Sequence, residues 1–194
     1  MQTNRVLIVG GGSAGWTAAA YLNATLNVGD QKVADISLVE SPNVPRIGVG
    51  EATIPNINHT LAAIGIDELD FMKAVDGTFK QSIRYVNWLD NKGEFYHHPF
   101  SRFGTGAHDD AGRRWLMSDR SVPFMNTISA QPILCEMGLA PKVFERVDLG
   151  IPVGYAFHMD ALKFADYLHA FATARGVTDY EDHVISVDMH ENGN

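Results

Sequence analysis

The pattern of hydrophobic and polar positions gives the chain two periodic ends and a weakly periodic middle. Near the start, a short apolar run at 6–9 enters three successive glycines, and an alanine-rich segment follows at 14–24. Short apolar runs bounded by glycine are typical of buried strands, and longer segments of good helix formers are typical of helices. The pattern therefore predicts a strand, a tight turn and a helix. A second apolar run, 34–39, ends in Glu40 and predicts the next strand.

Residues 41–81 predict an irregular loop followed by two helices. The loop, 41–55, holds three prolines and two glycines, and we expect its Ile47, Val49 and Ile54 to be buried. A helix is predicted to begin near Pro55, with one apolar face, and to end at Gly65. Asp67 is expected to cap a second helix. Further on, residues 82–88 and 95–97 predict two strands joined by a turn at Gly93.

Helical periodicity returns after a stretch, 99–152, that is rich in aromatic residues and punctuated by proline and glycine. Asp160 is a suitable N-cap for an amphipathic helix that ends at Gly176. The alternating run 184–189 predicts a strand, and 191–194 predicts a hairpin-type turn. A strand that enters a turn with no returning partner leads us to expect the N-terminal portion of a longer protein, with an incomplete sheet.

Composition narrows the classes of function. The chain of 194 residues is 45% hydrophobic and 20% charged, as ordinary globular proteins are. Its formal net charge of −8 argues against a nucleic-acid-binding surface. Cys135 is the single cysteine, which excludes an intrachain disulfide framework. We expect no metal site at His97 and His98, because no further ligands follow at suitable spacing. With no apolar run of membrane-spanning length and no signal-peptide pattern, a cytoplasmic enzyme is expected.

The first turn carries the clearest chemistry. Gly10, Gly12 and Gly15 fit G-x-G-x-x-G between a predicted strand and a predicted helix. Gly10 permits the tight turn, Gly12 lets the backbone approach a pyrophosphate, and Gly15 lets the helix pack closely on the strand. Glu40, at the end of the second strand, is placed to accept hydrogen bonds from a ribose hydroxyl. This pattern predicts a dinucleotide site and does not separate FAD from NAD. The alternative is a glycine-rich loop with an unrelated surface acid.

Four stretches occur together: GGGSAGW at 10–16, GVGEATIP at Gly48–Pro55, the lysine of DGTFKQSI at Lys80, and HMDALKFADYL at His158–Leu168. In combination they resemble the flavin-dependent tryptophan halogenases. The resemblance implies an α/β fold with a Rossmann-like FAD-binding domain of the flavin monooxygenase and halogenase type, incomplete in this chain. It implies FAD-binding segments at 1–77 and 153–194, with an inserted, partial substrate-facing region at 78–152.

The resemblance also implies a chemistry. FAD would arrive reduced, as FADH2, from a separate flavin reductase. With oxygen and a chloride or bromide co-substrate it would yield hypohalous acid, which a lysine directs onto an electron-rich arene such as indole or tryptophan. By motif match the lysine is Lys80. An amine can polarise hypohalous acid by hydrogen bonding, and a neutral amine can instead take the halogen covalently. A solvated surface lysine is the alternative reading.

The family match also assigns cofactor and substrate positions. The cofactor positions it implies are Gly10, Gly12, Ser13, Ala14, Gly15, Glu40, Gly50, Glu51, Ala52, Thr53 and Val184. Glu51 has an alternative role as an acid that stabilises a helix start. The stretch from Tyr96 to Phe100 resembles the family's Tyr-His-x-Phe, whose rings sandwich an indole, but has one residue more. His97 and His98 are therefore both candidates, together with Phe100, and a structural histidine and core phenylalanine are the alternative.

Two other functions stay open from the sequence. Another FAD-dependent oxidoreductase, such as a monooxygenase, would share the fingerprint and Glu40 without needing Lys80. A non-catalytic, truncated flavin-binding domain would need neither an arene nor a halide. The family's catalytic glutamate, its WxWxIP signature and its halide-binding backbone have no counterpart among these residues. The arene, the carbon attacked, the preferred halide and the oligomeric state are not specified by the sequence.

Overall fold

The computed structural model of the protein describes residues 5–47, 50–101, 110–142 and 153–189. The chain forms two compact units. Unit 1 takes residues 1–51, 58–77 and 159–194, and unit 2 takes residues 52–57 and 78–158. Both units are therefore assembled from segments that are distant in the sequence.

Unit 1 is built on a parallel sheet. Its strands β1 (Arg5–Val9), β2 (Asp35–Glu40) and β8 (Thr178–Glu181) lie in the order β1-β2-β8. Val9 lies opposite Val39, and Glu40 lies opposite Glu181. Because all three strands run the same way, their carboxyl ends meet at one edge of the sheet. In open α/β sheets this edge is where ligands bind.

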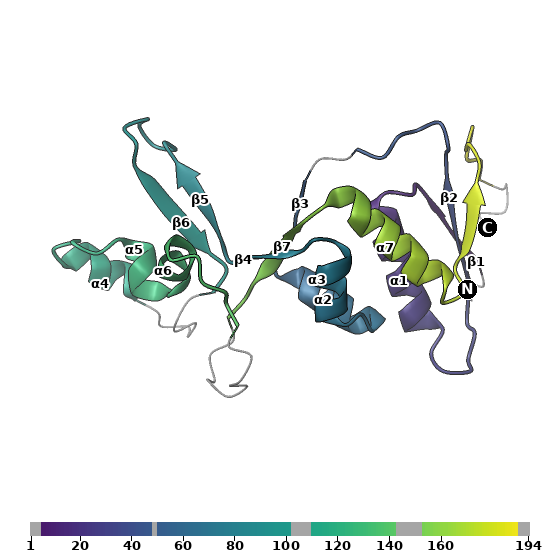
Figure 1. Cartoon of the computed structure of the whole chain (residues 1–194), viewed down its shortest axis with the longest axis horizontal. Coiled ribbons are helices and arrows are strands. Elements are labelled where there is room, and N and C mark those ends of the chain that lie inside the picture. Colours follow the sequence, from purple (N-terminus) through teal and green to yellow (C-terminus); the bar gives the residue numbers. More distant parts are fainter. Residues whose placement is uncertain (1–4, 48–49, 102–109, 143–152, 190–194) are drawn as a thin grey trace. The chain divides into compact units, whose positions relative to one another are not determined.

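Two long helices contribute to the buried apolar core of unit 1. Helices α1 (Ser13–Leu26) and α7 (Ala161–Thr173) lie side by side next to the sheet (Figure 1). Helix α1 contacts β1 and β2, α7 packs along α1, and Trp16, Ile36, Leu38 and Leu168 are completely or almost completely buried. Burying side chains of this size contributes roughly 1.5–3 kcal/mol each before the loss of conformational entropy. The predicted helix stripes thus face one common core.

The shorter helices begin and end where the sequence predicts. Helix α2 (Asn56–Ile64) ends before Gly65, whose φ of +77° suits glycine. Helix α3 (Glu68–Ala74) is capped by Asp67, whose carboxylate accepts hydrogen bonds from the backbone of Leu69 and Asp70. Asp160 caps α7 in the same way through the backbone N–H of Lys163. These cap predictions are confirmed.

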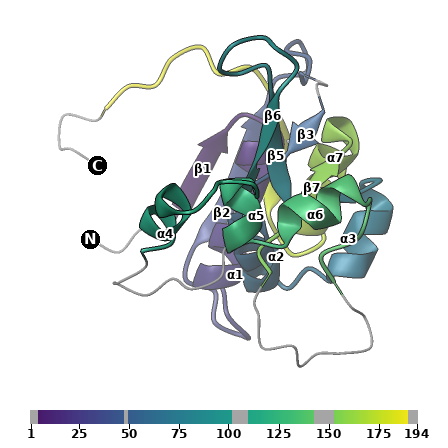
Figure 2. The same cartoon turned by 90° about the vertical axis from the view of Figure 1, so that its left-hand side faces the viewer.

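Unit 2 combines short strands with short helices. Strands β3 (Glu51–Ala52), β7 (Ala156–Met159) and β4 (Thr78–Lys80) form a sheet in the order β3-β7-β4. Strands β5 (Ser82–Val86) and β6 (Phe95–Pro99) form an antiparallel hairpin. Helices α4 (Ala111–Met117), α5 (Phe124–Ile128) and α6 (Gln131–Glu136) follow, and α5 and α6 pack beside the hairpin (Figure 2). The hairpin prediction is confirmed, whereas none of these three helices was predicted. Each is too short to produce a clear periodic pattern.

The predicted strand at 184–189 is wrong. Residues 184–189 form no strand, and Ile185 and Val187 are 94% and 82% exposed. The polar segment Thr178–Glu181 pairs with β2 instead. Hydrogen bonding to a neighbouring strand, and not apolar alternation in its own sequence, makes this segment a strand. The predicted turn at 191–194 lies outside the described residues.

The loop after β2 also differs from expectation. Ile47 and Ile54 are 82% and 59% exposed, and Val49 lies outside the described residues. Ile47 lines an open cleft, which accounts for its exposure. Among the helices that the structure describes, none has the length and apolar character needed to cross a membrane.

Candidate functional site

A cleft of about 520 Å³ lies at the carboxyl edge of the parallel sheet in unit 1. The first glycine turn, the end of β2, the following loop, the start of α7 and the chain after β8 all contribute to its walls. Most of the predicted cofactor residues meet here. The predicted residues that line the cleft are Gly10, Gly12, Ser13, Ala14, Glu40, Glu51 and Val184.

Glycine is required at two positions of the first turn and leaves a third position open. Gly10 has φ +115°, which suits glycine. A Cβ on Gly15 would lie 1.9 Å from the carbonyl oxygen of Gly10, so Gly15 permits the close contact of α1 with the turn. A Cβ on Gly12 would meet no atom within 4 Å, so a side chain there would project into the cleft. Among the described residues, no side chain caps α1, which leaves its N-terminus to an anion.

Glu40 stands at the end of β2 and is engaged by an arginine that the sequence analysis did not identify. Nη2 of Arg46 lies 3.0 Å from each carboxylate oxygen of Glu40. Nη1 of Arg46 lies 2.5 Å from Oδ1 of Asp166, on α7. Partial burial lowers the pKa of Arg46, but hydrogen bonds and opposite charges from Glu40 and Asp166 outweigh it and raise that pKa overall. Only the fold reveals Asp166; Arg46 could have been noticed as a base six positions after the acid.

Four predicted cofactor residues lie outside the described lining of the cleft: Gly15, Gly50, Ala52 and Thr53. Thr53 belongs to unit 2, where it is bonded to β7. Its backbone N–H donates to the carbonyl of Phe157 at 3.0 Å, and its hydroxyl accepts from the N–H of Phe157 at 3.0 Å. These bonds fix the position of the Thr53 backbone.

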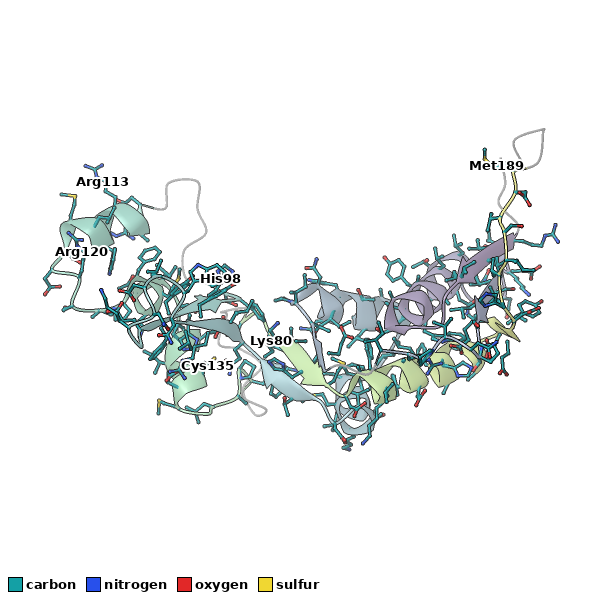
Figure 3. The ribbon with its side chains drawn as sticks, turned by 90° about the horizontal axis from the view of Figure 1, so that it is seen from above. Lys80, His98, Arg113, Arg120, Cys135 and Met189 are labelled. Atoms are coloured by element: carbon teal, nitrogen blue, oxygen red, sulfur yellow. The ribbon has the colours of Figure 1, made fainter. Side chains whose placement is uncertain are left out.

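Lys80, labelled in Figure 3, is half-buried at the end of β4. Its Nζ donates a hydrogen bond to the carbonyl oxygen of Thr53 at 3.0 Å. The same Nζ lies 5.4 Å from the centroid of the Phe100 ring, within the range of a cation–π contact. Partial burial and then the positive charge of Lys80 lower the pKa of His158, on β7. The structure therefore joins two of the sequence motifs, GVGEATIP and the lysine of DGTFKQSI.

The two candidate substrate histidines lie on opposite faces of β6. His97 pairs with Arg84 and is 6% exposed, whereas His98 pairs with Ile83 and is exposed. The ring of His97 is held between Ser82 Oγ, 2.7 Å from Nδ1, and Glu136 Oε1, 2.9 Å from Nε2. His97 thus has the contacts of a structural histidine. Strand alternation places His98 on the side that continues to Phe100, beside Lys80.

Metal chemistry has no support in the described part of the chain. There, no group of three or more histidine, cysteine, aspartate or glutamate side chains could hold a metal ion.

Comparison with known proteins gives the family. The family profile described as "Tryptophan halogenase" matches residues 5–194. The chain belongs to the tryptophan halogenase family. It is 34% identical to tryptophan 7-halogenase RebH from Lentzea aerocolonigenes, with 100% of this chain and 38% of that protein covered. It is 31% identical to tryptophan 6-halogenase ThaL from Streptomyces albogriseolus, over 97% of this chain and 38% of the relative.

Solved structures agree with this assignment. The tryptophan halogenase from Shewanella frigidimarina NCIMB 400 superposes with a TM-score of 0.88 at 36% identity, covering 100% of this chain and 39% of that one. The flavin-dependent halogenase Xcc4156 from Xanthomonas campestris gives a TM-score of 0.79 at 32% identity, covering 100% and 38%. The predicted halogenase-type α/β fold is confirmed. The chain spans about 38% of the length of these curated relatives.

Proposed function

We propose that this chain supplies the FAD site and the reactive lysine of an FAD-dependent halogenase. In this proposal, reduced FAD, oxygen and a chloride or bromide ion yield hypohalous acid, and Lys80 directs the halogen onto an electron-rich arene such as indole or tryptophan. Family membership supports flavin-dependent halogenation, and the relatives are named tryptophan 6- and 7-halogenases. By the resemblance, a separate flavin reductase provides the reduced cofactor.

The observation that carries the proposal is the hydrogen bond from Lys80 Nζ to the carbonyl of Thr53. A solvated surface lysine would have no reason to meet the family's distinctive GVGEATIP stretch. Here the amine is half-buried, and its acceptor is fixed by the two bonds between Thr53 and Phe157. An ammonium group with one of its three donors fixed keeps two donors for a further partner.

Lys80 has the chemistry that hypohalous acid requires. A remaining N–H can donate to the oxygen of the acid, which draws electron density from the halogen and makes it more electrophilic. The bond to Thr53 keeps the amine in one position, so an incoming acid meets a preorganised donor. Among the groups that unit 2 places near Lys80, the lowered pKa of His158 favours its neutral ring, which adds no second positive charge near neutral pH.

The cleft of unit 1 fits the dinucleotide part of FAD. The open position at Gly12 and the uncapped start of α1 would receive the pyrophosphate, and Glu40 would accept from the ribose. When bound, the reduced flavin supplies the electrons that activate oxygen. The residues of this chain hold that cofactor, and Glu51 and Val184 belong to the same cleft.

The arene is proposed to lie against His98 and Phe100. Both belong to one side of the β6 segment, and Phe100 also contacts the amine of Lys80. Aromatic faces hold an electron-rich ring by stacking. His97 is not proposed as a substrate contact, because Ser82 and Glu136 occupy both of its ring nitrogens.

The test uses the complete open reading frame that encodes these residues. The protein receives reduced FAD, oxygen, bromide and a panel of indoles, and mass spectrometry looks for the bromine isotope doublet. We expect a doublet from the wild type and none from Lys80→Ala. Lys92→Ala is the matched control, because Lys92 is an exposed lysine of unit 2 that is paired with Asp90. It should keep full activity.

Two outcomes would count against the proposal. Hydroxylated or unchanged arenes from a protein with bound flavin and saturating bromide would favour another flavin oxidoreductase. A doublet that persists in Lys80→Ala would remove Lys80 from the chemistry while leaving a halogenase in place.

A further inference from the structure

Arg46 holds the ribose-binding acid of the proposed FAD site in an unusual way. A single nitrogen, Nη2, lies 3.0 Å from both oxygens of Glu40, so it sits on the symmetry axis of the carboxylate. Both side chains are mostly buried, with exposed fractions of 25% for Arg46 and 21% for Glu40. Such a pair is screened less by solvent than an exposed ion pair. The carboxylate is therefore held in one orientation at the mouth of the cleft.

The position of the carboxylate is restricted from the other side by the glycine turn. A Cβ on Gly11 would lie 1.7 Å from Oε2 of Glu40, so the carboxylate occupies the space that a side chain at position 11 would take. Glu40 is thus packed between the backbone of Gly11 and the guanidinium of Arg46. The guanidinium itself is anchored to α7 by Asp166, at 2.5 Å.

The acceptor sites that Arg46 leaves free on Glu40 determine which ligand groups the acid can bind. An ionised carboxylate offers about four lone-pair sites, two on each oxygen. Arg46 uses one site on each oxygen, which leaves one on each for other donors. Two neighbouring hydroxyls of a ribose supply two donors at a matching spacing. Arg46 also offsets a negative charge that would otherwise repel the pyrophosphate of a dinucleotide.

The same arrangement bears on ribose phosphorylation. An arginine near the ribose acid accommodates a 2′-phosphate in some dinucleotide sites. Here Nη1 and Nη2 are both engaged by carboxylates, and Asp166 adds a further negative charge. The site therefore disfavours a phosphorylated ribose.

We propose that Arg46 is a positioning residue, which orients Glu40 to accept both hydroxyls of an unphosphorylated adenosine ribose and is itself oriented by Asp166. The inference rests on the proposed FAD site and extends it, because it assigns the recognition of the ribose to a three-residue relay. Arg46 touches Glu40 and not the reacting atoms, so it acts on the ligand through the acid.

The experiment measures how much the ribose 2′-hydroxyl contributes to binding. FAD and an FAD analogue whose adenosine ribose lacks that hydroxyl are titrated by flavin fluorescence into the protein encoded by the complete open reading frame. For the wild type we expect the analogue to bind about tenfold more weakly, as loss of a hydrogen bond to a charged group predicts. In Arg46→Gln the penalty should fall to about twofold, because Glu40 is free to turn away. Asp166→Asn, at a site that is 70% exposed, should give an intermediate penalty.

Arg175→Gln is the matched control. Arg175 follows α7 and lies over the ring of Phe171 at 3.5 Å, outside the described lining of the cleft. It should keep the tenfold penalty. FMN, which lacks the adenosine half, should bind wild type and Arg46→Gln equally.

The outcomes separate this inference from the proposed FAD site. If Arg46→Gln and Asp166→Asn weaken both ligands but keep the tenfold penalty, Arg46 supports the cleft only generally, and the positioning role is overturned while the FAD site stands. If wild type binds neither ligand, the FAD site and the relay fail together. If far-ultraviolet circular dichroism shows that Arg46→Gln does not fold, the binding penalty of Asp166→Asn alone tests the positioning role.

Discussion

The two units of this chain have different kinds of interior. In unit 1 the largest fully buried side chains are apolar, among them Trp16, Phe71 and Leu168. In unit 2 the interior is in part polar. All four buried polar residues of the described chain lie there: Gln81, His97, Ser129 and Gln131.

The polar interior of unit 2 is bonded across long sequence distances. Gln131 accepts from the N–H of Ser101 at 2.7 Å and donates to the carbonyl of Gly154 at 2.6 Å. Gln81 donates to the carbonyl of Leu139 at 2.6 Å. Such bonds connect loops that have no regular pattern of their own. Apolar burial is tolerant of small shifts, whereas each of these bonds needs its own donor and acceptor in place. We therefore expect unit 1 to be destabilised most by overpacking, and unit 2 by the loss of a single polar group.

The largest effect is expected at Gly15. In Gly15→Val the new Cβ would meet the carbonyl oxygen of Gly10 at 1.9 Å, and backbone atoms must move. We expect the free energy of unfolding of unit 1 to fall by about 3 kcal/mol or more. Gly12→Ala is the matched control, because its Cβ meets nothing within 4 Å: it should keep the fold and lose FAD binding. Urea unfolding, monitored by hydrogen exchange, measures the stability of Gly15→Val and of Gly12→Ala. Equal stability of the two variants would refute the packing argument.

The next effect tests unit 2. Gln131→Met keeps the volume at a site that is 2% exposed but leaves the Ser101 N–H and the Gly154 carbonyl without their partner. We expect a loss of roughly 2–4 kcal/mol, confined to unit 2. Hydrogen exchange resolved by mass spectrometry should show lost protection in residues 78–158, with FAD affinity unchanged. The exposed Gln31→Met serves as control, and loss of protection spread evenly over both units would contradict the comparison.

The smallest effect concerns charge beside Lys80. Burial first, and the charge of Lys80 second, lower the pKa of His158. Lys80→Met should raise this pKa towards 6.5 without reaching it, because burial remains. The pKa of His158 is lower in the folded state than in the unfolded state, whose value is near 6.5. The wild type therefore loses stability as the pH falls from the unfolded pKa to the folded pKa, and Lys80→Met should lose less. Proton NMR titration of the His158 ring measures the shift. Lys142→Met should leave it in place, and an unchanged His158 in Lys80→Met would argue against the interaction.

How much of the fold the sequence predicted depends on how local the signal is. The nucleotide turn, α1, α7 and the caps at Asp67 and Asp160 were predictable, because helical period and capping are local properties. β8 was not, because its polar sequence becomes a strand only beside β2. The helices α4–α6 were too short to show a period.

The candidate site was predictable as a set of positions and less so as a set of contacts. The family resemblance pointed to Lys80, and only the fold shows the amine bonded to Thr53. Likewise, the sequence left His97 and His98 as equal candidates, and strand alternation assigns them opposite faces. Asp166 lies in the His158–Leu168 stretch that carries the resemblance, but only the fold shows that it pairs with Arg46.

The order in which the strands occur in the chain has a consequence for biosynthesis. Ser37 pairs with Thr178, so β2 gains its second neighbour only after the whole of unit 2 has been made. Until then a nascent chain on the ribosome carries β1, α1 and β2 with one edge of β2 unpaired. An unpaired strand edge is prone to pair with other chains. Production of this protein should therefore depend on chaperones, and slower translation past residue 40 should not help it to fold.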